Sequence, residues 1–292
     1  MTHRHPLLPL VLALGVVSIS TAAVLIKLCD DAPPEVIAAA RLGIATVVLT
    51  PVAVGRRRRL RLRRAHVKYL VLAGVLLAAH FHFWIASLKH TSVLSSVVIV
   101  TTNPLFVGLA SFALFRERVG RGLVVAIGVS GLGGVLIALS DSAAAGGTLY
   151  GDALALCGAV MASSYFLVGR KIRRDLDTLS YIVPVYAVAA VLLVAWAGVT
   201  GHGFGGYRMA TYVYFVLLAV VPQLLGHGSL NWALRYLPAT TLSVFILGEP
   251  IGSTMLARAL LDEPIAPLQA AGGGLILAGI LIASRSSAPS AP

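Results

Sequence analysis

Charge of either sign is scarce in this sequence. Only 12% of its 292 residues are Asp, Glu, Lys or Arg, whereas a soluble globular chain contains about 25%. Hydrophobic residues make up 58%, and the mean hydropathy is +0.90. Apolar stretches near the roughly 20 residues that cross a hydrocarbon core recur along the whole length. The composition excludes a soluble protein and predicts an all-α membrane protein with no room for a soluble domain.

The sequence also lacks the patterns of common catalytic and cofactor sites. It has no nucleophile with a paired base, no zinc-ligand spacing and no phosphate-binding loop, so we expect no cofactor, no metal and no enzymatic activity. Its two cysteines, Cys29 and Cys157, fall in the outer halves of predicted spans. Two packed thiols are the simpler interpretation, and a disulfide is the alternative.

Ten apolar segments joined by short connections are predicted to cross the membrane. The N-terminal run MTHRHPLLPLVLALGVVSISTAA imitates a secretory signal, but its apolar part continues to Ile26, so we interpret it as the first span. The predicted spans are residues 7–28, 34–54, 69–89, 92–114, 119–139, 150–170, 178–200, 212–234, 238–260 and 266–284.

Lysine and arginine are unevenly distributed between the two sides of these spans. With a cytoplasmic N-terminus, 18 of the 23 fall on the cytoplasmic side, 4 on the outer side, and Arg41 within a span. Positive charge marks the cytoplasmic side, so both termini are predicted to be cytoplasmic. The run RRRRLRLRR at 56–64 follows from this topology and from attraction to anionic headgroups. We therefore expect membrane lipid, and not nucleic acid, as its partner.

The two halves of the sequence repeat each other. An offset of 146 residues aligns Asn103-Pro104 with Glu249-Pro250, Glu117 with Glu263, Gly128 with Gly274, and Gly133 with Gly279. A five-span unit is thus duplicated, as residues 1–142 and 143–292. Because five is odd, the second unit enters the membrane from the opposite side. Such inverted repeats are characteristic of secondary transporters, whose halves meet around a site near the midplane.

Two similar sequence segments, one from each half, indicate a specific family. NPLFVGLASFALFRERVGRGLVVAIGVSGLGGVLIA and EPIGSTMLARALLDEPIAPLQAAGGGLILAGILIA, with ten spans in two inverted sets, resemble the EamA-like branch of the drug/metabolite transporter superfamily. The resemblance covers essentially the whole chain. It implies a secondary exporter of a small metabolite in a bacterial inner membrane, with an amino acid as the favoured substrate. Other solutes, such as nucleosides or sugars, are alternatives, because members differ widely in substrate.

Polar side chains at helical spacing predict a substrate site between the halves. The eighth span carries a stripe of polar residues four apart, which would be costly against lipid: Gln223, His227 and Asn231. In the third span His80 and Trp84 share a face, while His82 lies about 200° from His80 and cannot join it on one metal ion. Packing between helices is the alternative role for His80.

Two prolines are predicted to frame the same site. Pro104 and Pro250 lie at the centres of their spans, and each removes a helical hydrogen bond. Unpaired backbone at this depth is tolerated only inside protein or along a water-filled cavity, although simple helix shaping is the alternative. We assign Asn103 and Tyr165 to the same region. Interhelical hydrogen bonding explains Tyr165 equally well.

Two charged residues inside spans need a partner. The repeat equivalent of Glu249 is the neutral Asn103, so the fold does not require a charge there. An ionised acid at the bilayer centre costs roughly 2.5–3.5 kcal/mol unless it is paired or wetted. We predict that Glu249 binds a substrate amine or carries a proton; a protonated Glu249 within a kinked helix is the alternative. Arg41 either extends outward to the interface or turns inward toward a buried acid or a substrate carboxylate.

The remaining motifs have structural interpretations. Glu117 and Glu263 precede the fifth and tenth spans and are predicted to face the N-termini of those helices. A set of glycines is predicted to let helices approach closely, within one chain or between copies of a homo-oligomer: Gly128, Gly131, Gly133, Gly134, Gly272, Gly273, Gly274 and Gly279. A membrane-embedded enzyme with His80, His227 and Glu249 as acid-base groups is the competing functional class.

Overall fold

The computed structural model of this chain is all-helical in the part that it describes, which is residues 6–55, 64–103, 105–107, 109–110, 121–143, 149–172, 176–233, 245–246 and 248–286. Six helical stretches there are long and apolar enough to cross a bilayer. They are α1 (Leu8–Leu28), α2 (Pro34–Gly55), α3 (Arg64–Leu88), α7 (Leu149–Ile172), α8 (Thr178–Val199) and the run formed by α9 (Met209–Leu218), η1 (Ala219–Gly226) and α10 (His227–Ala233).

Four further helices complete the described fold: α4 (Val93–Val100), α6 (Arg121–Ala143), α12 (Gly248–Leu260) and α13 (Pro267–Ser286). The apolar stretches that include α4, α6 and α13 are shorter than those of the six long helices. The all-helical class is therefore confirmed. The count of ten crossings stays a prediction, because residues 111–120 and 234–244, with Glu117 among them, lie outside the described part.

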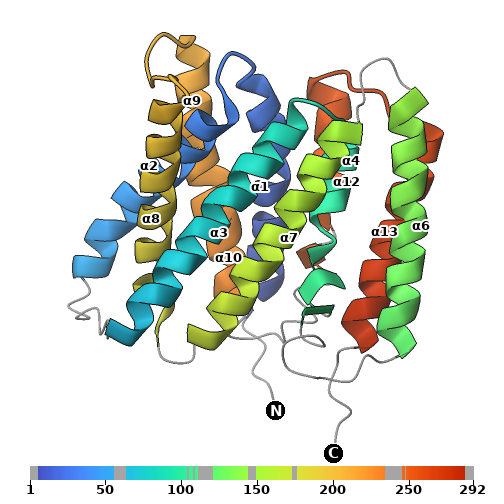
Figure 1. Ribbon diagram of the computed structural model, residues 1–292, viewed down its shortest axis with the longest axis horizontal. Helices are drawn as coiled ribbons and strands as arrows, with labels where there is room; N and C mark the ends of the chain where they lie inside the picture. The colour runs from blue at the N-terminus through green and yellow to red at the C-terminus, as the bar shows by residue number, and fades with distance from the viewer. Residues whose placement is uncertain are drawn as a thin grey trace, which may run out of the picture.

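The first helices of the two halves run in opposite directions. In Figure 1, α1 (dark blue) runs from the lower toward the upper edge of the bundle, whereas α7 (yellow-green) runs from the upper toward the lower edge. The start of α7 packs beside the residues that follow α3, because a Cβ at Gly151 would lie 2.8 Å from Thr91 Cβ. This opposed direction supports an inverted relation between the halves.

The last helices of the two halves, α6 and α13, pack side by side at one end of the bundle (Figure 1). A Cβ at Gly133 would lie 2.5 Å from the Gly272 carbonyl oxygen, and a Cβ at Gly272 would lie 2.6 Å from the Gly133 carbonyl oxygen. The two backbones touch here only because both residues are glycine. A Cβ at Gly279 would meet Ser130 in the same way.

Other glycines of the predicted set do not serve this packing. A Cβ at Gly128, Gly131, Gly134 or Gly274 would meet nothing within 4 Å in the described part of the chain. The predicted close packing is thus confirmed for Gly133, Gly272 and Gly279, whereas these four make no such contact with the described residues and their role stays a prediction. Helical periodicity explains the split, because neighbouring glycines face different sides of one helix.

Glu263 ties the two halves together at the upper end of the bundle. Its Oε1 accepts a hydrogen bond of 2.7 Å from the Val93 backbone N–H at the start of α4, and its Oε2 lies 3.4 Å from Lys27 Nζ. The prediction that Glu263 faces the N-terminus of its own next helix is wrong. The carboxylate satisfies the first unpaired N–H of α4 instead, across the boundary between the halves.

Asp31 makes a second connection between the halves. Its carboxylate accepts hydrogen bonds from the Arg208 backbone N–H at 2.8 Å and from the Thr211 hydroxyl at 2.6 Å, and the Arg208 guanidinium pairs with Asp30. These hydrogen bonds lower the pKa of Asp31 below its usual value, so the group is ionised at neutral pH. The upper end of the bundle is therefore held by contacts between the loop after α1 and the start of α9.

Both cysteines are free thiols, Cys29 buried and Cys157 exposed, so the alternative of a disulfide is wrong. Burial raises the pKa of the Cys29 thiol to about 12. A thiol held in its protonated form is a poor nucleophile. Cys29 is therefore a packed side chain, as the simpler interpretation of the sequence expects.

The orientation of the bundle is testable by cysteine labelling in intact cells. In a background without Cys29 and Cys157, we expect Gly205→Cys to react with a membrane-impermeant maleimide, because the 18 to 4 division of positive charge predicts its loop to be outside. Arg58→Cys should react only after permeabilisation. The reverse pattern would contradict the proposed topology.

Candidate functional site

Arg41 of α2 is buried in the middle of the protein, with 1% of its surface exposed. Its Nε donates a hydrogen bond of 2.8 Å to Gln223 Oε1 on η1, and Gln223 Nε2 donates to the Tyr186 hydroxyl on α8. Of the two orientations that the sequence allows, the structure has the inward one. This chain of hydrogen bonds joins the first half of the protein to the second.

Aromatic rings of α3 cover the other side of the Arg41 guanidinium. The guanidinium carbon lies 4.5 Å from the centroid of the Phe81 ring and 5.8 Å from that of Trp84. His80 stacks on Trp84, with ring centroids 6.0 Å apart and an interplanar angle of 8°. These cation–π contacts favour the charged side chain in a place where water is excluded.

His80 connects α3 to α7. Its Nδ1 lies 2.9 Å from the Gly158 carbonyl oxygen. Because a carbonyl oxygen only accepts hydrogen bonds, this contact assigns a hydrogen to Nδ1. The structure therefore gives His80 a packing role between helices, and it also places the ring beside Trp84.

His227 and Glu249 complete a cluster around Arg41. His227 begins α10 and Glu249 lies in the first turn of α12, and both are half-buried. His80, His227 and Glu249 are each close enough to Arg41 to interact electrostatically. Within the described residues no carboxylate lies within 4.0 Å of the guanidinium, so Arg41 and Glu249 are neighbours without a direct ion pair.

We name these residues the Arg41 cluster: Arg41, His80, Phe81, Trp84, Tyr186, Gln223, His227 and Glu249. Gln223 enters it from η1, a π-helical segment that contains Pro222. A π-helical turn widens the helix, and such segments occur frequently at functional sites. The predicted stripe thus brings Gln223 and His227 to the cluster. The third member, Asn231, has a side chain outside the described part.

Of the other predicted site residues, Tyr165 lies close enough to Tyr186 of the cluster to interact with it electrostatically, and Asn103 contacts α7. The Ser163 hydroxyl donates to the Asn103 backbone oxygen at 3.2 Å, which joins the end of α4 to α7. Tyr165 stacks on Tyr181 with centroids 6.1 Å apart. Pro250 is buried in α12, and Pro104 lies outside the described residues.

Sequence reasoning missed several polar contacts. Tyr186 was not selected, although it places a hydroxyl in the apolar run VPVYAVAA. His82 faces away from His80, as its angle predicts, and its Nδ1 lies 3.7 Å from Glu35 Oε2. The other oxygen of Glu35 lies 2.6 Å from His202 Nδ1. An acid at the start of a span, with two histidines elsewhere in the chain, was the available indication.

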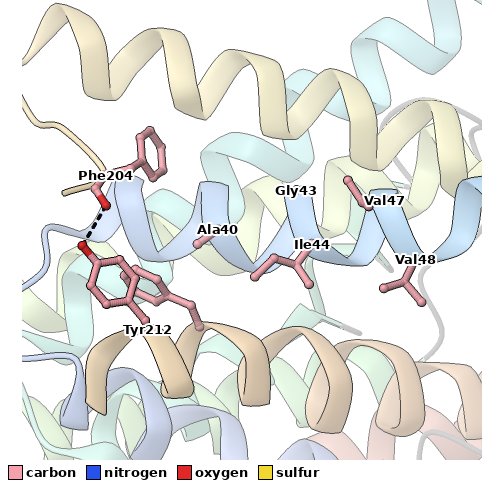
Figure 2. Close-up of a pocket in the computed structure, with 8 residues that line it drawn as sticks. Ala40, Gly43, Ile44, Val47, Val48, Phe204 and Tyr212 are labelled. Atoms are coloured by element: carbon pink, nitrogen blue, oxygen red, sulfur yellow. Dashed lines mark hydrogen bonds between the residues drawn. The ribbon is translucent and has the colours of Figure 1, made fainter. Parts of the chain in front are cut away.

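An apolar groove lies between α2 and α9, on a different face of α2 from Arg41. Figure 2 shows the labelled aliphatic side chains of α2 along one wall, and Tyr212 hydrogen-bonded to the Phe204 carbonyl oxygen at 3.0 Å. The groove is lined by Ala40, Gly43, Ile44, Val47, Val48, Phe204, Tyr212 and Phe215. These residues suit contact with lipid chains, and they offer no charge to a polar solute.

Comparison with known proteins agrees with this arrangement. Residues 7–139 and 149–285 each match the EamA-like transporter family. The chain is 25% identical over 254 residues to an uncharacterized transporter of Archaeoglobus fulgidus, covering 86% of this chain and 89% of the relative. It is 24% identical over 258 residues to the uncharacterized transporter YyaM of Bacillus subtilis, covering 86% and 84%.

A crystal structure of another protein has the same fold. It superposes with a TM-score of 0.66 at 20% sequence identity, and the match covers 96% of this chain and 97% of the other. Two family matches in one chain also suggest that the halves are repeats. The chain is therefore a multi-pass membrane protein and belongs to the EamA-like transporter family.

Proposed function

We propose that this protein is a secondary transporter that exports a small metabolite, with an amino acid as the favoured substrate, across a bacterial inner membrane by alternating access. The single observation that supports this most strongly is the Arg41 cluster, in which α2 and α3 of the first half meet η1, α8, α10 and α12 of the second. A buried charged site shared between two opposed repeats is the arrangement that secondary transporters use.

Alternating access requires contacts that can break as the halves rock. Glu263 and Asp31 supply such contacts at the upper end, where both bind the other half through hydrogen bonds exposed to solvent or close to it. Glu35 with His202 adds another. These polar contacts exchange for water at low cost. They favour a state that is closed at this end, and opening would separate them.

Reconstitution in liposomes tests the proposal. We expect purified protein to exchange an unchanged, labelled solute across the bilayer, in a panel of amino acids, nucleosides and sugars at two pH gradients. Protein-free liposomes are the control. Recovery of a chemically altered product would support the membrane-embedded enzyme instead. Neither flux nor product for any solute would overturn transport.

A further inference from the structure

Two hydrogen-bond donors in the Arg41 cluster have no acceptor among the residues that the structure describes. Arg41 Nη1 and Trp84 Nε1 are both buried and both without a partner in that part of the chain, on side chains that are 1% and 5% exposed. A guanidinium and an indole N–H only donate hydrogen bonds. A buried donor without an acceptor retains its full desolvation penalty, so such atoms require an explanation.

The side chains that carry these two donors are neighbours. The Arg41 guanidinium carbon lies 5.8 Å from the Trp84 ring centroid, and both side chains are fixed by other contacts. Gln223 accepts from Arg41 Nε, Phe81 lies under the guanidinium, and His80 stacks on Trp84. Both side chains are therefore held in place by contacts that do not use the two unpaired N–H groups, which reduces the entropy lost when an acceptor binds.

Charge in the cluster identifies the acceptor. Arg41 is the only permanently charged cation among the cluster residues and Glu249 is their only acid, so a ligand with one negative and one positive group complements both. A carboxylate has two coplanar oxygens that suit a guanidinium edge and a neighbouring N–H. Nucleosides and sugars contain no such group. A phosphate monoester brings up to two negative charges and would leave one of them unmatched here.

We propose that Arg41 Nη1 and Trp84 Nε1 bind the carboxylate of the transported substrate. This inference rests on the proposed function and narrows its substrates to carboxylates. Glu249, which lies near Arg41 without a direct ion pair, provides the negative partner for an ammonium group. A zwitterionic amino acid satisfies both charges, and it also supplies the acceptor that two buried donors lack.

Ligand-induced thermal stabilisation of the full chain in detergent tests this. The probes are the twenty common L-amino acids, the carboxamide of each, and short monocarboxylates from acetate to hexanoate. We expect at least one acid to stabilise the wild-type protein, and its carboxamide to bind about 10- to 100-fold more weakly, as the loss of a charge-assisted hydrogen bond implies.

Two variants, each with a matched control, test whether Trp84 and Arg41 cause the preference for the acid over its carboxamide. Trp84→Phe keeps one aromatic ring for His80 and removes the indole N–H together with the second fused ring. The loss of packing affects both ligands, whereas the loss of the N–H should weaken binding of the acid more than binding of its carboxamide. Trp196→Phe, on the exposed face of α8, is the matched control and should not change the preference. Arg41→Gln should abolish the preference for the acid, whereas Arg258→Gln at the exposed end of α12 should preserve it. If Arg41→Gln does not fold, Trp84→Phe decides alone.

Several outcomes overturn the inference: equal binding of acid and carboxamide, an unchanged preference in Trp84→Phe, or no stabilisation by any carboxylate. Its failure is distinguishable from failure of the proposed function. If liposomes show flux of a solute that has no carboxylate, the proposed carboxylate site is refuted and the proposed transport function is supported. If the protein binds an acid more tightly than its carboxamide but shows no flux in liposomes, the proposed transport function is refuted and the carboxylate site is supported.

Discussion

Glu249→Gln is expected to reduce transport in liposomes by about 10- to 100-fold, the cost of removing a charged hydrogen-bond partner, while leaving the protein folded. Glutamine keeps the size and the hydrogen-bonding capacity of the side chain but cannot ionise. The repeat equivalent at this position is Asn103, so the fold already accommodates an amide there. The backbone oxygen of Glu249, which lies 3.5 Å from the Ser20 hydroxyl, is unaffected by the substitution.

The pH dependence of transport distinguishes a role of Glu249 as an ionisable group in transport from a role as a protonated hydrogen-bond donor within its helix. If Glu249 binds the substrate amine or carries a proton, the Gln variant should lose the pH dependence of the wild type across pH 5 to 8. Glu263→Gln is the matched control: it weakens the contacts to Val93 and Lys27 and should lower thermal stability without flattening the profile. Wild-type flux with an unchanged pH profile in Glu249→Gln would show that the acid serves only as a hydrogen-bond donor to its helix.

Gly133→Ala is expected to destabilise the protein strongly. The added Cβ would lie 2.5 Å from the Gly272 carbonyl oxygen, and a backbone atom cannot rotate away as a side chain does. Relief requires that α6 and α13 separate along their contact, and overpacking of this kind costs about 1–3 kcal/mol, occasionally more. We expect a lower unfolding temperature in detergent and a larger decrease in the double variant Gly133→Ala, Gly272→Ala.

Gly131→Ala is the control on the same helix. A Cβ at Gly131 meets nothing within 4 Å, and alanine is about 1 kcal/mol more favourable than glycine inside a helix, so this variant should be as stable as the wild type or more so. Equal unfolding temperatures for Gly133→Ala and the wild type would contradict the glycine contact between α6 and α13.

The sequence by itself determined the class of the protein and the position of many helices. The spans predicted at 7–28, 34–54 and 178–200 agree closely with α1 at Leu8–Leu28, α2 at Pro34–Gly55 and α8 at Thr178–Val199. This succeeds because a bilayer forces each crossing segment to satisfy its own backbone, so the length of an apolar run reveals the helix. The repeat and the family resemblance follow from residue order alone, and the family is confirmed.

Only the tertiary structure decided which side chains meet. The sequence left Arg41 equally able to point outward or inward, and the packing of α2 against η1 and α3 turned it toward Gln223 and Phe81. The same packing added Tyr186, which no motif marks, and moved Glu263 from its own helix to the start of α4. Hydropathy and periodicity describe one helix at a time. The partner of a side chain across a helix interface depends on crossing angle and rotation, which arise only when all the helices pack together.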